Sequence, residues 1–343
     1  MLFHGVNVVY KVDPFIPTID GPFDKDNSLN AEDIKNLQDW GMNFVRLGVM
    51  WEAVERQPGV YDDAYLDKVE TLINRLGEAG IYTLVDQHQD VFARTICGEG
   101  FPDFYAKQVI GKNPSCFSPL IDSLLKPVFD EFGICKDMSS YGYQVDENDD
   151  PLISECNKLM FATYYDTTDS INAFDALYNN KDGLRDKFIA FWDKSSARFS
   201  SNPYVVGFDP INEPSIGNYY KDLQLLLPGH MDRHELQPLY EDIFERYYAN
   251  SKDTVMWFEP NTFPNVIGFP FFGNGKVPGI IFESGFTNPP GAEFGSVNHV
   301  FNDHTYCCQL NPEVCAAGEP DVNLKNECKA WHRKRIGTRS ADA

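Results

Sequence analysis

Short apolar runs alternate with amphipathic segments along most of the chain. The apolar runs, which are expected to form strands, lie at residues 2–9, 43–49, 81–85, 205–208, 254–258 and 299–306. They read as nearly continuous hydrophobic stretches, which is typical of parallel strands that are covered by helices. The alternation of such runs with helical segments therefore predicts an α/β fold built on a parallel sheet.

The segments between these strands show helical periodicity and helix start signals. Asn30 is expected to cap a helix that ends near Gly41, because Asn favours the first position of a helix and Gly its end. Asp62 and Asp63 are expected to open a second helix, since acidic groups suit a helix N-terminus. Further helical periodicity is present at residues 168–199, 234–250 and 323–339.

The strand-then-helix order continues through six units. A (β/α)8 barrel needs eight strands to close, so the pattern predicts a barrel truncated after its sixth β/α unit. The chain is expected to continue beyond both of its ends. At the C-terminus two strands of the barrel are missing. At the N-terminus the first strand begins at the second residue, and a protein rarely starts inside a core strand, because terminal residues are poorly ordered unless other contacts hold them. We therefore assign residues 1–343 to one partial barrel domain.

The alternation breaks at about residues 95–156, which are rich in Pro and Cys. Long loops in compact domains are usually lids or binding loops. This stretch is expected to be a disulfide-stapled excursion over one face of the barrel and not a separate domain.

Charge and cysteine content narrow the classes of function. Because 51 acidic residues oppose 29 basic ones, for a formal net charge of −22, a nucleic-acid partner is not expected. The eight cysteines show neither a CxxC pair nor zinc-type spacing, which favours disulfides and an oxidising compartment. We expect a secreted protein or one of a lysosomal or other acidic compartment, whose signal peptide is not in this segment.

Polar side chains follow the predicted strands. Asn212 and Glu213 come directly after the strand at 205–208, and Pro214 ends the loop. In (β/α)8 enzymes the catalytic residues lie just past the C-terminal ends of the barrel strands, which is where Glu213 is expected. The amide of Asn212 suits sugar binding, because an amide can both donate to and accept from a sugar hydroxyl. Glu213 is therefore predicted to be a catalytic acid/base, with a solvent-exposed loop glutamate as the alternative. The other strand ends are expected to deliver to the same rim Lys11, Arg46, Trp51, His88, Asp90, Glu259, His304 and Tyr306.

The order of these residues resembles that of the clan A glycoside hydrolases, specifically family 5. The matching features are an Arg on strand two, a His on strand three, Asn-Glu-Pro on strand four and His-x-Tyr on strand six. Residues 5–11, 87–90 and 98–103 resemble the endoglycoceramidase branch of that family, and the resemblance runs from residue 2 to about residue 340. It implies a TIM barrel that cleaves the β-bond between oligosaccharide and ceramide in glycosphingolipids with retention of configuration. It implies no metal or organic cofactor.

The resemblance also implies roles for individual residues. A retaining glycosidase needs an acid/base and a nucleophile whose carboxyl groups are about 5–5.5 Å apart. Glu213 matches the acid/base. The residues that match substrate-binding positions are Asn212, His88, Asp90, Lys11, Arg46, His304 and Tyr306. The position of Arg46 inside a strand favours orienting the acid/base over touching the sugar, and a merely buried, paired Arg is the alternative.

The chain departs from the family pattern at the nucleophile. The family carries this Glu at the end of strand seven, but no Glu after Tyr306 follows an apolar strand. Glu283 imitates the motif, although it precedes His304 in the chain and the nucleophile should follow it. The nucleophile is therefore expected outside this chain, and this chain alone is expected to be inactive, with Glu283 as the alternative nucleophile.

Two other functions stay open. A family 5 β-glucanase or a glucosylceramidase-like enzyme would share the carboxylates and would act on another β-glycoside. A non-catalytic glycan or glycolipid binder would follow if the chain ends at Ala343. Peripheral contact with lipid fits a ceramide aglycone. The Phe cluster Phe269, Phe271 and Phe272 is interpreted equally well as an apolar wall for the ceramide chain or as plain loop packing. Glu259 is interpreted equally well as site lining or as a simple strand cap.

Overall fold

One parallel sheet organises the part of the chain that the structure describes. The computed structural model describes residues 2–110, 116, 123–124, 135–261, 284–292, 298–304, 322–323, 325–326, 328–330 and 332–333. Within these residues the sheet has six strands, all paired in parallel. Their order across the sheet is β1 (Gly5–Val8), β2 (Phe44–Gly48), β5 (Tyr82–Asp86), β6 (Val205–Asp209), β7 (Met256–Phe258) and β8 (His299–Phe301). The order follows the chain, as in the first six strands of a (β/α)8 barrel.

All six predicted strands are confirmed, although several of their ends shift. The first begins at Gly5 and not at Leu2, because pairing with β2 starts there. A side chain at Gly5 would place its Cβ 1.7 Å from the carbonyl oxygen of Phe44, so this register requires Gly. β7 begins at Met256 and not at Thr254, whose N–H is taken by a turn to the Ser251 carbonyl (3.3 Å).

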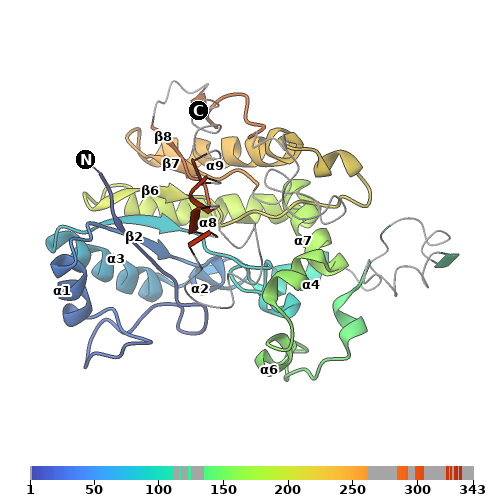
Figure 1. Ribbon diagram of the computed structural model, residues 1–343, viewed down its shortest axis with the longest axis horizontal. Coiled ribbons are helices and arrows are strands. Elements are labelled where there is room, and N and C mark those ends of the chain that lie inside the picture. The colour runs from blue at the N-terminus through green and yellow to red at the C-terminus, as the bar shows by residue number, and fades with distance from the viewer. Residues whose placement is uncertain are drawn as a thin grey trace.

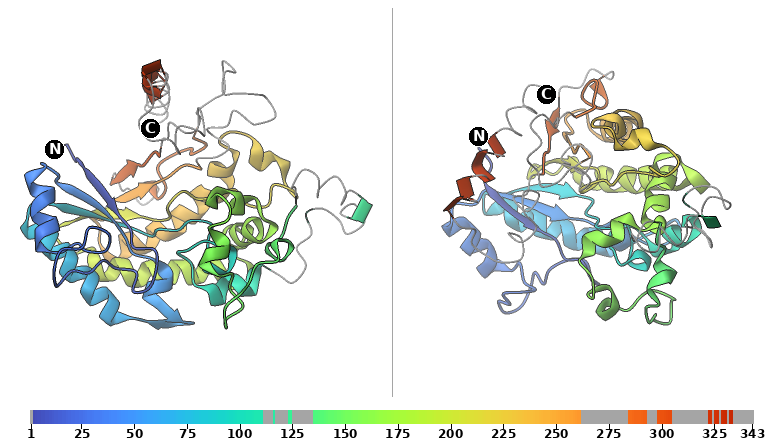
Figure 2. Two further views of the ribbon diagram at one scale, coloured as in Figure 1. Left: turned by 60° about the horizontal axis from the view of Figure 1, so that its bottom comes forward. Right: turned by 45° about the vertical axis from the view of Figure 1, so that its right-hand side comes forward.

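Four helices, one after each of the first four strands of the sheet, lie along the outer side of the curved sheet (Figures 1 and 2). They are α1 (Ala31–Asp39), α3 (Asp63–Glu78), α8 (Leu184–Phe199) and α9 (Gln237–Asn250). Asn30 caps α1 as predicted, and its side chain accepts the N–H groups of Glu32 and Asp33. Asp62 likewise caps α3 and accepts the N–H of Tyr65. Side-chain caps thus set the starts of α1 and α3.

The helical periodicity predicted at 168–199 is confirmed, and the structure divides it into two helices. α7 (Thr168–Tyr178) ends before a short 3-10 turn, η4 (Lys181–Gly183), and α8 begins after it. Asn180, Asp182 and Gly183 all take left-handed backbone conformations, with φ of 50°, 52° and 72°. Asn, Asp and Gly tolerate this region best, so these residues break the helix.

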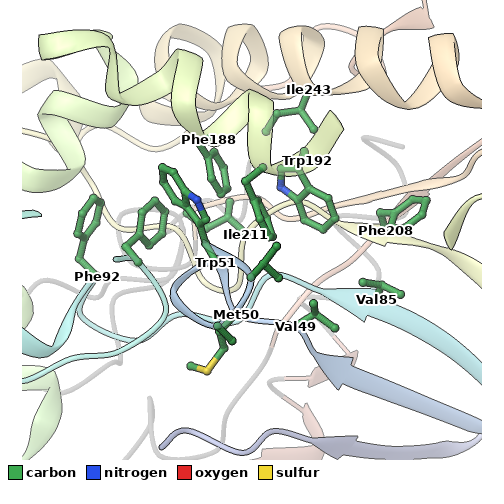
Figure 3. Packing of buried hydrophobic residues seen from close by; sticks show 14 of the residues in the cluster. Val49, Met50, Trp51, Val85, Phe92, Phe188, Trp192, Phe208, Ile211 and Ile243 are labelled. Atoms are coloured by element: carbon green, nitrogen blue, oxygen red, sulfur yellow. The ribbon is translucent and has the colours of Figure 1, made fainter. Parts of the chain in front are cut away.

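A short helix and a hairpin between β2 and α3 were not predicted. These are α2 (Trp51–Val54), β3 (Glu55–Gln57) and β4 (Val60–Tyr61). The expected place of Trp51 at the rim is wrong, since the indole is fully buried and lies 5.3 Å from the Phe188 ring of α8. Figure 3 shows this indole in the core between the sheet and the helices, with Trp192 of α8 and Ile243 of α9 nearby.

The excursion is held by disulfides, as predicted. Cys97 pairs with Cys156 and Cys116 with Cys135. Its described elements are η1 (Arg94–Ile96), α4 (Asp103–Val109), η2 (Met138–Tyr141), α6 (Ile153–Cys156) and, just after it, η3 (Phe161–Asp166). The first disulfide ties the loop after β5 to a segment that lies 59 residues later.

The remaining elements lie after β6 and at the end of the chain. The loop from β6 to α9 contains η5 (Leu223–Leu226) and a π-helical turn, η6 (Asp232–Leu236). The described residues between 322 and 333 are helical, in agreement with part of the helix predicted at 323–339. In the described part of the chain, no helix combines the length and apolar character needed to cross a bilayer.

Candidate active site

Glu213 lies at the C-terminal end of the sheet, four residues after β6. Its backbone takes a left-handed conformation with φ of 40°, which is unusual for a residue with a side chain. Two contacts hold this conformation: the Glu213 N–H donates to Glu259 (2.8 Å), and the Gln89 side chain donates to the Glu213 carbonyl (3.2 Å). Backbone strain of this kind costs on the order of 1 kcal/mol and gathers at functional sites.

Asn212 is fixed from both sides beside Glu213. Its amide group donates to the Gln89 carbonyl (2.9 Å), and its amide oxygen accepts from Arg46 (3.1 Å). Each end of the amide keeps one further hydrogen-bonding position, since an amide offers two donors and two lone pairs. Asn212 is therefore oriented by the protein and still able to bind a hydroxyl.

Beneath these residues, Arg46 gathers three carboxylates. Its guanidinium donates to Asp86 (2.9 Å), Asp209 (2.7 Å) and Glu259 (2.9 Å). The side chains of the three acids are at most 1% exposed and that of Arg46 is 6% exposed. Because burying a charge is costly unless it is paired, this network depends on all of its members. Burial alone would lower the pKa of Arg46, but the three carboxylates outweigh burial and raise it.

His304 connects the two glutamates above Arg46. Its Nδ1 lies 2.8 Å from Glu213 and its Nε2 lies 2.9 Å from Glu259. Burial alone would lower the pKa of His304, but the charge of Glu259 and the hydrogen bonds to both glutamates raise it to about 10. Burial would likewise raise the pKa of Glu259, yet His304 and Arg46 outweigh burial and hold it at about 2. A cationic His304 donates through Nδ1 to a carboxyl oxygen of Glu213 and through Nε2 to the Glu259 carboxylate.

Asp209, Glu259 and His304 lie close enough together to suggest a metal site. The Arg46 guanidinium, however, already bonds to both Asp209 and Glu259, and the Asn302 amide also donates to both (2.8 and 3.1 Å). Burial and the nearby charge of Glu259 raise the pKa of Asp209 well above its ordinary value. The positive charge that a metal would supply is thus provided by Arg46 and His304.

A second cluster lies at the ends of β1 and β5. His88 Nδ1 bonds to Asp86 (2.9 Å), and its Nε2 lies 3.4 Å from Asp90. Lys11 forms ion pairs with Asp90 and with Glu99, the latter at 2.7 Å. Burial alone would lower the pKa of His88, but Asp86 and Asp90 outweigh it and raise the pKa to about 9. Because Asp86 bonds to both Arg46 and His88, the two clusters form one connected network.

Comparison with known proteins agrees with this arrangement. Residues 16–114 match the family model described as Cellulase (glycosyl hydrolase family 5). Over 304 residues the chain is 33% identical to an endoglycoceramidase of Hydra vulgaris, which covers 89% of this chain and 52% of that protein. It is 31% identical over 304 residues to an endoglycoceramidase of Cyanea nozakii, with 89% and 53% covered. The chain belongs to glycosyl hydrolase family 5.

The fold agrees with this membership. The solved structure of endo-glycoceramidase II from Rhodococcus sp. matches with a TM-score of 0.62 at 22% identity, over 97% of this chain and 61% of that one. The six parallel strands of the described residues are therefore those of a partial (β/α)8 barrel. The chain spans about half the length of the curated relatives it matches.

The structure brings most of the predicted site residues of this family 5 chain together. Arg46, Asn212, Glu213 and His304 share one hydrogen-bonded network. Tyr306, Glu283 and the Phe269, Phe271 and Phe272 cluster lie outside the described residues. The Arg46 guanidinium donates to four side chains of the site itself, which are Asp86, Asp209, Asn212 and Glu259. Glu259 is part of the site and not a simple strand cap.

Four residues of the site were missed from the sequence: Asp86, Asp209, Glu99 and Asn302. Asp86 and Asp209 each end an apolar strand, so their acidic side chains were a signal that the site continues beneath the rim. Glu99 lies in the segment 98–103 that carried the family resemblance, but its side chain had no assigned role.

Proposed function

We propose that the protein that carries this chain is a retaining β-glycosidase that hydrolyses the bond between oligosaccharide and ceramide in glycosphingolipids. The observation that supports this most is the position of Glu213 beside Asn212 and His304, next to the Lys11–Asp90–His88 cluster. The similarity to the endoglycoceramidases of Hydra vulgaris and Cyanea nozakii suggests the ceramide linkage.

In the proposed mechanism, a nucleophilic carboxylate attacks the anomeric carbon and forms a glycosyl-enzyme. In the same step the sugar–ceramide bond breaks, and Glu213 protonates the departing glycosidic oxygen. It then acts as base and takes a proton from the water that attacks the glycosyl-enzyme. After the first step Glu213 carries a negative charge, and the cationic His304 at 2.8 Å stabilises that charge. Asn212 would bind the 2-hydroxyl of the sugar, a contact that strengthens as positive charge develops on the anomeric carbon.

The cluster of His88, Asp90 and Lys11 is proposed to hold the first sugar. Burial alone would raise the pKa of Asp90, but His88 and Lys11 outweigh it and hold the pKa at about 2. A carboxylate that stays ionised accepts from sugar hydroxyls, and the half-exposed Lys11 ammonium donates to them. Arg46 serves as a positioning residue for Asn212 and Glu259.

We also propose an oxidising compartment, either outside the cell or an acidic organelle. Two disulfides in the described excursion support this, because such bonds persist where thiols are not kept reduced. Peripheral contact with a lipid surface follows from the proposed ceramide-linked substrate.

Substrate choice provides the test of this function. The protein that carries this chain is expected to release free oligosaccharide from a ganglioside in detergent micelles, and to leave soluble β-glucan intact. Chromatography of the released sugars measures both. Hydrolysis of β-glucan without release from ganglioside would refute the ceramide-linked activity and favour the β-glucanase alternative. Release of single glucose units from glucosylceramide would favour the glucosylceramidase alternative.

The nucleophile is testable by trapping the covalent intermediate. A 2-deoxy-2-fluoro lactoside with a good leaving group is expected to form a stable glycosyl-enzyme. The fluorine slows both steps, and the good leaving group keeps the first step fast, so the intermediate accumulates. Peptide mass spectrometry then locates the labelled residue. We expect the label on a peptide other than the one that contains Glu283, and a label on Glu283 would contradict the proposed assignment.

A further inference from the structure

A short segment outside the proposed acid/base site runs antiparallel to the end of the loop after β5. The Asp90 N–H donates to the Glu99 carbonyl (3.1 Å), and the Glu99 N–H donates back to the Asp90 carbonyl (2.8 Å). A Cβ at Gly98 would lie 2.2 Å from the Asp90 carbonyl oxygen, and one at Gly100 would lie 2.4 Å from that of His88. Among residues 98–100, only Glu99 therefore presents a side chain next to the cluster of His88, Asp90 and Lys11.

The Glu99 side chain is aimed at Lys11. The Lys11 ammonium bonds to Asp90 and to Glu99, and the Lys11–Glu99 distance is 2.7 Å. An ammonium has three donors, so these two bonds leave one for a ligand. The Lys11 side chain is 45% exposed, whereas Asp90 is 11% and Glu99 20% exposed. Lys11 thus reaches from β1 across to two carboxylates whose backbones pair with each other.

Contacts at both ends hold residues 98–100 in place. Cys97, which precedes them, is disulfide-bonded to Cys156. The Gly100 N–H donates to the half-buried Glu52 carboxyl (2.5 Å), and the Gly100 carbonyl accepts from the Gln87 side chain (3.2 Å). Glu99 is therefore held rigidly and can fix the position of the flexible Lys11 side chain.

We propose that Glu99 is a positioning residue that holds the Lys11 ammonium against Asp90, so that Lys11 and Asp90 together present a fixed donor and acceptor to the sugar. This inference rests on the proposed function, because a sugar is the ligand. It extends that function by naming the residue that sets sugar affinity without touching the reacting bond.

The charges around Glu99 make this action sensitive to pH. Burial raises the pKa of Glu99 to about 7, although Lys11 opposes the rise. The groups that face it are Lys11 after β1, Asp90 after β5, Glu52 of α2 and Tyr165 of η3. As pH falls through about 7, Glu99 takes up a proton and loses its charge. Lys11 is then held by Asp90 alone, so its position becomes less fixed.

A double-mutant cycle tests the inference. The four proteins are wild type, Glu99→Gln, Lys11→Met and the variant with both changes, each assayed for hydrolysis of ganglioside in detergent micelles. Glu99→Gln is expected to raise KM about tenfold and to change kcat less than about twofold, because sugar binding is weakened in ground and transition state alike. The double variant is expected to have the KM of Lys11→Met, since Glu99 acts through Lys11. Multiplicative effects on KM, an unchanged KM in Glu99→Gln, or a matching loss of kcat would overturn the proposal.

Two further measurements separate positioning from a merely structural role. Glu99→Asp keeps the charge on a shorter side chain and is expected to give a KM between those of wild type and Glu99→Gln. A KM no better than that of Glu99→Gln would count against the proposal. In wild type, KM is expected to rise as pH falls through about 7, and this rise should be absent in Glu99→Gln and Lys11→Met.

The outcomes also distinguish the inference from the function on which it rests. Wild-type protein that neither binds nor hydrolyses ganglioside would refute the proposed function and, with it, this inference. Wild-type turnover combined with independent effects of the two substitutions would overturn the inference alone. Asp39→Asn, which breaks an exposed ion pair on α1 (2.5 Å), is the control and should leave KM unchanged.

Discussion

An Arg46→Met variant is expected to lose about 3–5 kcal/mol of folding free energy, since removing one partner leaves buried charges uncompensated. Met fills much of the space, but it leaves Asp86, Asp209 and Glu259 without the guanidinium that bonds to all three. Arg46→Lys is expected to recover little of this, because an ammonium lacks the planar fork that reaches several carboxylates at once. Chemical denaturation followed by intrinsic fluorescence measures the loss.

The loss of folding free energy caused by Arg46→Met is expected to be smaller at low pH. The pKa of Glu259 is held at about 2 in the folded protein, so Glu259 contributes stability that is present above its unfolded pKa and lost as pH falls toward 2. In Arg46→Met the pKa of Glu259 is lowered less, so Glu259 contributes less stability that acid can remove. The gap between the two proteins therefore narrows from about pH 5 to pH 3.

Arg56→Met is the matched control for Arg46. Arg56 also forms a short ion pair, with Asp13 (2.5 Å), but the two side chains are 45% and 70% exposed. Exposed pairs of this kind contribute about 0–1 kcal/mol. If Arg46→Met cost no more than Arg56→Met, the buried network would not be a main source of stability.

The sequence predicted the strands because their apolar runs are local signals. The same holds for the caps at Asn30 and Asp62, where one side chain decides where a helix begins. The break between α7 and α8 was also local, in the left-handed residues Asn180, Asp182 and Gly183, but the apolar periodicity on both sides masked it. Apolar runs and helix caps therefore predicted most of the strands and helices. The break between α7 and α8 was missed because left-handed residues and apolar periodicity gave opposing signals.

The site was less predictable because its contacts join distant parts of the chain. Arg46 and Asp209 lie 163 positions apart in sequence, yet their side chains bond at 2.7 Å. Sequence order indicated which residues reach the C-terminal edge of the sheet, such as Glu213 and His304. It gave no sign that Asp209 pairs with Arg46 or that Glu99 pairs with Lys11, since these pairings depend on strand register and loop folding.

Replacing Glu213 with Gln is expected to lower kcat for ganglioside hydrolysis by about 10²–10⁴-fold, the usual effect of losing a general acid/base. Gln has the same size and still accepts a hydrogen bond from His304 at the 2.8 Å position, so the fold should be unaffected. The missing function is proton transfer: Gln neither protonates the glycosidic oxygen nor takes a proton from water. Steady-state assays on ganglioside measure the loss, and thermal unfolding checks that the variant is folded.

An aryl lactoside separates the two halves of the Glu213 role. A leaving group such as dinitrophenolate departs without protonation, so the first step should proceed in Glu213→Gln while the second, which needs a base, stays slow. Azide needs no base to attack the glycosyl-enzyme and is expected to restore turnover of this substrate, with a β-lactosyl azide as product. Glu245→Gln, at an exposed position of α9, should behave as wild type in each assay. If Glu213→Gln kept full activity on ganglioside, or if azide gave no azide product, Glu213 would not be the acid/base.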